Sequence, residues 1–259
     1  MRFRLNLYCH SKRNIIPINY LYEISGWIYS LLRKVDRDFT CWLHNTGYRV
    51  ENKQFKFFTF SRLNIPRWHR HGDRLVILSD RVQLTISFLL DEAANNFIMG
   101  LFKDQELEIA DHRTRARFTV ESVEALALPE FKETMSFKCM SPICVSKTVM
   151  NNHQKSAEYL HPSHPEYGER LFDNLINKYR AFGEFSDTAR QQAQFDFKYK
   201  EKAKSNLIKI KSDTPQETRV RGFSYLFQVT APPELLRLGY LAGFGEKNSL
   251  GFGCVEVVK

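Results

Sequence analysis

Residues 243–253 (GFGEKNSLGFG) bring together residue types that let a backbone approach a ligand closely. Glycine adopts positive φ without steric cost and leaves room for a bound group. Lys247 adds a positive charge, and the free N–H groups of such a loop can hold a phosphate. The candidate ligand-binding residues are Gly243, Gly245, Lys247, Asn248, Ser249, Gly251 and Gly253. The alternative is a plain connection between the last helix and the last strand.

This stretch does not match the common nucleotide-binding loops. The order G-x-x-x-x-G-K-[ST] of a P-loop is absent. The stretch also does not follow a strand and open a helix, as the dinucleotide-binding loop does. Neither kind of nucleotide-binding loop is therefore predicted here.

An excess of positive charge supports a polyanionic partner. The chain has 38 Lys and Arg against 29 Asp and Glu, a net charge of +9. Such a balance attracts nucleic acid through counterion release. Within TRVRGF, Arg219 and Arg221 are two positions apart on a predicted strand, so they point the same way and can hold a nucleic-acid backbone. The alternative is a charged outer strand face.

Cysteine and histidine usage argues against disulfides, metals and cofactors. The five cysteines are scattered and form no C-x-x-C pair, which favours a reducing cytoplasm. His161 and His164 form a metal-like pair, but no carboxylate or cysteine accompanies them. No stretch reaches the roughly 18 apolar residues of a membrane span, and the first residues indicate a strand instead of a signal peptide.

The elements that must position these residues follow from hydrophobic periodicity. The first half predicts strand 2–8, helices 20–33 and about 36–45, strand 54–61, a hairpin of 74–79 with 81–87, helix 89–102 and one or two strands in 105–127. This is the β-α-β-β-α-β order of a ferredoxin-like domain.

The second half predicts a degraded copy of the same order. Proline opens helix 165–181 and the helix of PPELLRLGYLAG, and the chain ends on the strand FGCVEVVK. The predicted fold class is α+β, with two tandem ferredoxin-like (RRM-like) domains over residues 1–125 and 126–259. The glycine-rich loop belongs to the second domain.

Three segments together resemble a known family. GYLAGFGEKNSLGFGCVEV is similar to the carboxy-terminal glycine-rich signature of the CRISPR repeat-processing endoribonucleases (the "Cas six" family of the RAMP superfamily). MRFRLNL with IPINYLYEISGWIYSLL resembles the opening strand and first helix of that family, and SPICVSK resembles its motif at the start of the second domain. The resemblance implies two ferredoxin-like domains, a loop that structures an RNA-binding face, and catalysis without metal.

The same resemblance implies three catalytic residues in the first domain. The family places a tyrosine in the first helix, a histidine after it and a lysine at the following strand; Tyr29, His44 and Lys56 match in GWIYSLL, CWLHNTGY and FKFFTF. Histidine titrates near neutral pH and suits proton transfer from the RNA 2′-OH and to the leaving 5′-oxygen. A nearby cation stabilises the charged phosphorane. The products would be a 2′,3′-cyclic phosphate and a 5′-OH.

Each of these residues has a structural alternative. Tyr29 could lie at the core margin, His44 could stabilise a helix end, and Lys56 could be a solvated strand lysine. Arg49 and Lys53 are rival cations in the connecting segment.

The resemblance implies an endoribonuclease that cleaves precursor CRISPR RNA within its repeats to release guide RNAs. The expected partner is CRISPR repeat RNA in its precursor form, with a CRISPR effector complex and a homodimer as open further partners. The main alternative is a non-catalytic repeat-binding module of the same fold. Two more distant alternatives remain. A generic RNA-binding protein would show no preference for the repeat, and a metal-dependent nuclease would lose its cleavage activity in the presence of a chelator.

Overall fold

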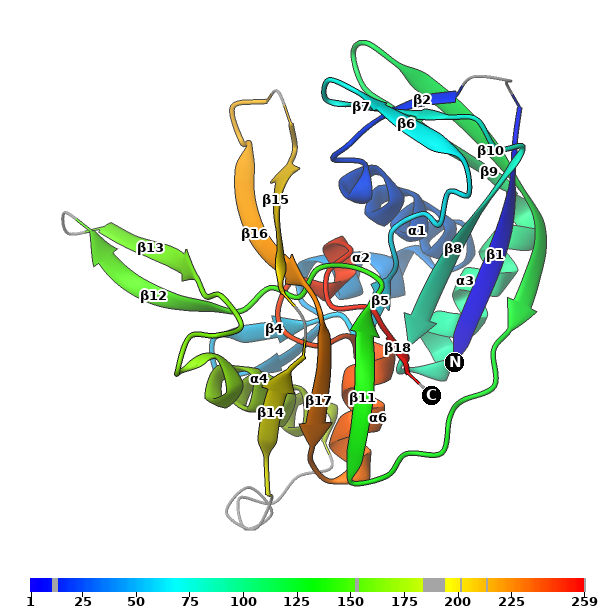
Figure 1. Ribbon diagram of the computed structural model, residues 1–259. Helices are drawn as coiled ribbons and strands as arrows, with labels where there is room; N and C mark the ends of the chain where they lie inside the picture. Colours follow the sequence, from blue (N-terminus) through cyan, green and yellow to red (C-terminus); the bar gives the residue numbers. More distant parts are fainter. Residues whose placement is uncertain (11–13, 152–153, 184–193, 201, 213, 259) are drawn as a thin grey trace.

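Two antiparallel sheets, each with its own helices, form the body of the molecule (Figure 1). The computed structural model describes residues 1–10, 14–151, 154–183, 194–200, 202–212 and 214–258. The α+β class predicted from the sequence is confirmed. Among the described helices, none is long and apolar enough to cross a membrane.

The first sheet has the order β5-β8-β1-β10-β9. Its strands are β1 (Arg2–Cys9), β5 (Phe58–Phe60), β8 (Arg81–Phe88), β9 (Glu106–Ala110) and β10 (Arg115–Ala125). The helices of this half are α1 (Leu21–Val35), α2 (Arg37–Asn45) and α3 (Asp91–Lys103). Phe3, Leu5 and Leu7 of β1 are buried, as their alternation predicts, because side chains alternate across a strand.

The second sheet repeats the same arrangement, in the order β14-β17-β11-β18. Its strands are β11 (Thr134–Cys139), β14 (Asp196–Tyr199), β17 (Leu226–Thr230) and β18 (Val255–Val257), and its helices are α4 (Tyr167–Phe182) and α6 (Pro233–Ala242). Lys259, at the end of the predicted last strand, lies outside the described residues. In both sheets the four repeated strands lie in the spatial order second, third, first, fourth.

Smaller sheets of two or three strands accompany these two. Two hairpins, β12–β13 (Ser146–Asn151, Gln154–Tyr159) and β15–β16 (Lys204–Ile210, Thr218–Ser224), project from the second half in Figure 1. The remaining strands are β2 (Asn14–Pro17), β3 (Tyr48–Val50), β4 (Lys53–Phe55), β6 (Trp68–His71) and β7 (Arg74–Ile77).

The predicted hairpin of 74–79 with 81–87 is wrong. Strand β7 pairs with β2 and β6, whereas β8 pairs with β1 and β5. The Ser-Asp turn carries the chain from one sheet to another, and the Asp80 carbonyl accepts a hydrogen bond from the Cys9 backbone N–H. Alternating runs on both sides of a turn do not specify which neighbour each strand takes.

The single strand predicted at 54–61 is also wrong, because the chain breaks at Phe57, whose backbone is left-handed with a φ of 54°. Phe55 and Phe57 pack in the core of the second half, while Phe58 and Phe60 pack in the core of the first. The break therefore lets one aromatic run serve both cores.

Candidate active site

Tyr29 of α1 and His44 of α2 lie together. Their ring centroids are 5.0 Å apart, with an edge-to-face angle of 82°. Tyr29 also packs on Phe58, at a centroid distance of 5.5 Å, which fixes the phenol against the first core. His44 is exposed, in the last turn of α2. The structure thus brings two of the three predicted catalytic residues into contact.

Local sequence signals determine where α2 begins and ends, and so where the imidazole lies. The Asp36 side chain accepts a hydrogen bond from the Phe39 backbone N–H and caps the helix start. Gly47 ends the helix at a φ of 56°, and its N–H donates to the Trp42 carbonyl at 2.8 Å.

A cavity of about 410 Å³ lies between α1 and α2. It is lined by Gly26, Tyr29, Ser30, Arg33, Thr40, Cys41, His44 and Asn45. Arg33 follows Tyr29 by one helical turn, so both point to the same side of α1. Arg33 was not singled out from the sequence, although its i, i+4 spacing from Tyr29 would have indicated it.

Tyr29 is protonated in this environment. Burial raises the pKa of its phenol to about 12, and a hydrogen bond with the Ser249 side chain opposes that rise. At neutral pH the phenol is therefore a hydrogen-bond donor and not a base. The contact with Ser249 also ties the glycine-rich loop of the second half to this site.

Lys56 lies near His44 but binds its backbone and not its ring. Its ammonium donates to the Leu43 carbonyl and, at 2.7 Å, to the His44 carbonyl. These acceptors are at the C-terminal end of α2, where a cation is favoured by the helix dipole. Burial, followed by the charge of Arg49, lowers the pKa of Lys56 to about 8. The geometry supports a helix-capping role.

The two rival cations differ from Lys56 in exposure. Lys53 is exposed on β4, and its ammonium has no ionic or hydrogen-bonded partner in the described parts of the chain. Arg49 is exposed on β3, with its Nε 3.4 Å from the Thr46 carbonyl. Lys53 is therefore the less engaged of the two.

We expect Lys56→Met to act mainly on stability. The change removes both hydrogen bonds to the end of α2, so it should lower the free energy of unfolding by about 1–2 kcal/mol. Lys53→Met, a matched loss of one lysine, should change it by less than about 0.5 kcal/mol. Urea unfolding measures both. Equal effects of the two variants would contradict a capping role for Lys56.

The glycine-rich loop is folded tightly onto its neighbours. The Asn248 amide donates to the carbonyls of Phe244 and Phe252, at 3.1 and 3.0 Å. The φ values of Gly243, Gly245, Gly251 and Gly253 are all positive, between 70° and 92°. A Cβ on Gly253 would lie 2.0 Å from the Phe244 carbonyl oxygen. Packing alone therefore requires glycine here.

Only part of the predicted RNA-binding set in this loop faces outward. Lys247 is exposed, with a left-handed backbone at φ 58°, a conformation that is strained for a lysine. The four glycines are buried, and the Asn248 amide is engaged inside the loop. Of the predicted residues of this loop, Lys247 and the partly exposed Ser249 are therefore the ones best placed to meet a ligand.

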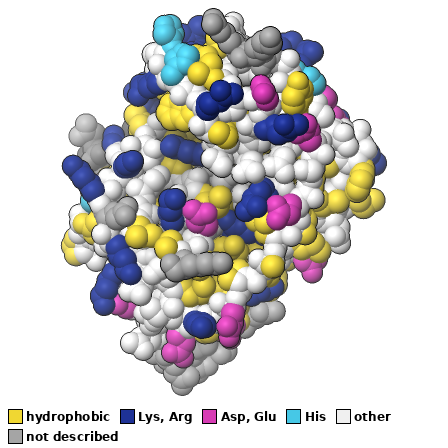
Figure 2. Space-filling model, turned by 45° about the vertical axis from the view of Figure 1, so that its right-hand side comes forward, with side chains coloured by type: hydrophobic (Ala, Val, Ile, Leu, Met, Phe, Trp, Pro, Cys, Tyr) yellow, Lys and Arg dark blue, Asp and Glu magenta, His cyan; other side chains and the backbone are white. Residues whose placement is uncertain are grey.

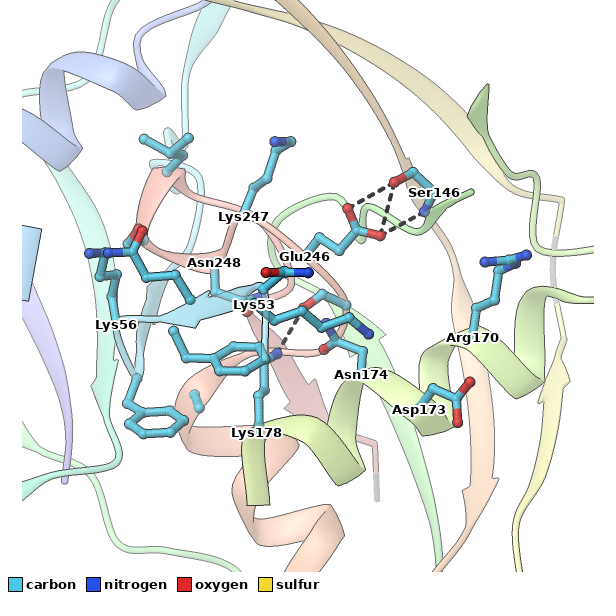
Figure 3. Close-up of a pocket in the computed structure, with 18 of the residues that line it drawn as sticks. Lys53, Lys56, Ser146, Arg170, Asp173, Asn174, Lys178, Glu246, Lys247 and Asn248 are labelled. Carbon is cyan, nitrogen blue, oxygen red and sulfur yellow. Dashed lines mark hydrogen bonds between the residues drawn. The ribbon is translucent and has the colours of Figure 1, made fainter. Parts of the chain in front are cut away.

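A second cavity, of about 630 Å³, lies between the loop, α4 and strand β4 (Figure 3). Its charged lining residues are Lys53, Lys56, Arg170, Asp173, Lys178, Glu246 and Lys247. Glu246 is held by Ser146, whose backbone N–H and hydroxyl both donate to the carboxylate. Positive groups outnumber acids in this cavity, and that favours an anionic ligand.

Arg219 and Arg221 lie on the projecting hairpin β15–β16 (Figure 1). Both are exposed, while Val220 between them is buried, so the predicted shared face is present. Arg219 donates to the Glu217 carboxylate at 3.1 Å and Arg221 to the Ser205 hydroxyl at 2.8 Å. In Figure 2, Lys and Arg side chains are scattered over the face shown, with hydrophobic side chains between them.

Two family models together match nearly the whole chain. The model "CRISPR-associated protein Cas6, N-terminal" matches residues 15–124. The model "CRISPR associated protein Cas6, C-terminal" matches residues 126–257.

Curated relatives and a solved structure agree with these models. The chain is 30% identical to the CRISPR-associated endoribonuclease Cas6 1 of Methanocaldococcus jannaschii, over 95% of this chain and 88% of the relative. It is 26% identical to a CRISPR-associated endoribonuclease-like protein Cas6 of Pyrococcus furiosus, over 100% of this chain and 99% of the relative. The structure of a Cas6-related gene product from Pyrococcus furiosus superposes with a TM-score of 0.85 at 25% identity, covering 100% and 98% of the two chains. The chain therefore belongs to the Cas6 family of CRISPR-associated endoribonucleases.

Proposed function

We propose that the chain cleaves precursor CRISPR RNA within its repeats and releases guide RNAs by a metal-independent mechanism. The 2′-OH attacks the adjacent phosphorus, and the 5′-oxygen leaves, giving a 2′,3′-cyclic phosphate and a 5′-OH. The observation that carries this proposal is the contact between Tyr29 and His44 at the cavity between α1 and α2.

Two residues of this cavity suit the proton transfers and hydrogen bonding that the reaction needs. The exposed His44 imidazole can accept the 2′-OH proton or protonate the 5′-oxygen. The Tyr29 phenol, which stays protonated, can donate a hydrogen bond to a non-bridging phosphate oxygen as negative charge develops. The RNA 2′-OH is itself the nucleophile, so the reaction does not need an activated water molecule or a nucleophilic side chain.

The negative charge of the phosphorane also needs a nearby cation to stabilise it. Lys56 is engaged by the α2 carbonyls, so its role as this cation is the weakest of the three predicted roles. Arg33 lines the same cavity as Tyr29 and His44, and no ion pair or hydrogen bond engages its guanidinium within the described residues. We assign phosphate stabilisation to Arg33, with Lys53 as the second candidate.

The domain arrangement belongs to the same proposal. We assign residues 1–125 and 126–259 to two ferredoxin-like domains, and the shared strand order of the two sheets supports this. Lys247, Ser249, Arg219 and Arg221 would hold the RNA, with the buried glycines shaping the loop that presents Lys247. An effector complex and a second copy of the chain remain proposed further partners.

The second candidate is a non-catalytic repeat-binding module. It is favoured by the name of the Pyrococcus furiosus relative, which is only endoribonuclease-like. This candidate needs the same basic surface but not the Tyr29–His44 pair.

Incubation with the CRISPR repeat RNA of the encoding organism, in excess EDTA, separates the candidates. The proposal predicts cleavage at one position in EDTA and a cyclic phosphate on the upstream product. Tight binding without cutting, with or without added divalent metal, would establish the binding module. Cleavage that occurs with divalent metal and is lost in EDTA would establish a metal-dependent nuclease.

A further inference from the structure

Lys178 of α4 is a buried lysine that no step of the proposed reaction uses. It is 1% exposed and forms part of the floor of the cavity beside the glycine-rich loop (Figure 3). Its ammonium donates to the carbonyls of Gly243, at 2.5 Å, and Gly245, at 2.8 Å. No carboxylate bonds to it among the described residues. A buried amine held only by two carbonyls is costly, so we expect it to have a role beyond packing.

The two acceptors are the residues that set the start of the loop. Gly243 and Gly245 have φ values of 92° and 70°. The next residue, Glu246, is held by the segment leading into β12. Its backbone N–H donates to the Cys144 carbonyl, and its carboxylate accepts a hydrogen bond from the Ser146 backbone N–H. Lys178 and these contacts together fix the first half of the loop on α4 and the segment before β12.

The other half of the loop reaches the candidate active site. The Asn248 amide bridges the two halves through Phe244 and Phe252. The Ser249 carbonyl accepts a hydrogen bond from the Ser25 hydroxyl of α1 at 2.7 Å, and the Ser249 side chain bonds to the Tyr29 phenol. A continuous series of hydrogen-bonded residues thus joins α4 of the second half to α1 of the first.

We propose that Lys178 is a positioning residue for Tyr29, acting through the glycine-rich loop and Ser249. The amine has enough donors to hold two carbonyls that converge on one point, which a shorter or apolar side chain cannot do. Loss of these hydrogen bonds lets the loop shift, and Ser249 then no longer holds the phenol in its place beside His44. The inference rests on the proposed cleavage function, because it assigns Tyr29 a role in that reaction.

The test compares Lys178→Met with Lys198→Met, an exposed lysine of β14 that pairs with Asp196. Single-turnover cleavage by Lys178→Met should fall about 30- to 100-fold, the cost of a misplaced catalytic group. Its affinity for repeat RNA should fall much less than its cleavage rate, because Lys247 of the shifted loop is only one of the proposed RNA contacts. In protein labelled with ¹³C at tyrosine Cζ, the Tyr29 resonance, assigned with Tyr29→Phe, should move. Lys198→Met should match wild type in all three measurements.

A second variant keeps the proposal testable if Lys178→Met does not fold. Lys178→Gln retains two N–H donors on a shorter side chain. It should show a smaller loss of cleavage, with a smaller shift of the Tyr29 resonance in the same direction. A folded variant with an unmoved Tyr29 resonance and wild-type cleavage overturns the proposal. Failure of both variants to fold also overturns it, because Lys178 is then only structural. If wild type does not cut, the cleavage function fails, while the Tyr29 resonance still decides the positioning role.

Discussion

Replacement of His44 by alanine should reduce single-turnover cleavage of repeat RNA by about 10³-fold or more, while RNA affinity changes by less than about threefold. The imidazole is the group beside Tyr29 that can both accept and donate a proton. It is exposed, and its described side-chain contacts are the Tyr29 ring and the Asn45 side chain, whose Oδ1 lies 3.0 Å from Nδ1. Its removal should therefore cost little stability.

His10→Ala is the matched control for this variant. His10 is also exposed, at the end of β1, where its Nε2 lies 2.6 Å from the Thr119 hydroxyl. It takes no part in the cavity between α1 and α2. We expect wild-type cleavage from His10→Ala. Cleavage by His44→Ala within about tenfold of wild type would move proton transfer to other residues.

Replacement of Gly253 by alanine should have the largest effect on stability. The new Cβ would lie 2.0 Å from the Phe244 carbonyl oxygen, and the φ of 78° is itself unfavourable for alanine. Backbone atoms cannot yield as a flexible side chain can, so we expect a loss of about 4 kcal/mol or more. For a protein of this size that is a fall in Tm of roughly 8–16 °C. RNA binding should weaken as the loop distorts.

Gly72→Ala separates two causes of the expected loss of stability, the steric contact of the new Cβ and the left-handed backbone. Gly72, in the turn between β6 and β7, also has a positive φ, 60°, but a Cβ added there would meet nothing within 4 Å. The cost there should be only about 1–2 kcal/mol, the penalty for left-handed backbone. Thermal unfolding measures both variants. Equal losses in Tm would show that the contact with Phe244 is not what requires glycine at position 253.

Periodicity predicted most of the elements, because burial of one face leaves a strong pattern in the sequence. The alternation in β1 and the apolar stripe of α1 are examples, and both elements form where expected. Strand partners were less predictable. The assignment of β7 and β8 to one hairpin was wrong, because a turn signal carries no information on the long-range pairing of β8 with β1.

The candidate site was also predictable only in part, because its contacts join residues that are far apart in the sequence. Tyr29, His44 and Lys56 came from a resemblance, and the sequence does not show that the Lys56 ammonium is taken up by the end of α2. Nor does it show that Asn248 is engaged inside its own loop, or that Lys178 reaches Gly243 across 65 residues. Such contacts depend on tertiary packing, which single-residue patterns do not encode.

The most direct test of the proposed chemistry is cleavage by wild type of a repeat RNA that carries one 2′-deoxy nucleotide immediately upstream of the cut, in excess EDTA. Attack by the 2′-OH predicts that this RNA binds like the unmodified repeat and is not cut there, since the nucleophile is missing. Cutting of the 2′-deoxy substrate at the same position would contradict that mechanism, because the attacking oxygen would then have to come from water.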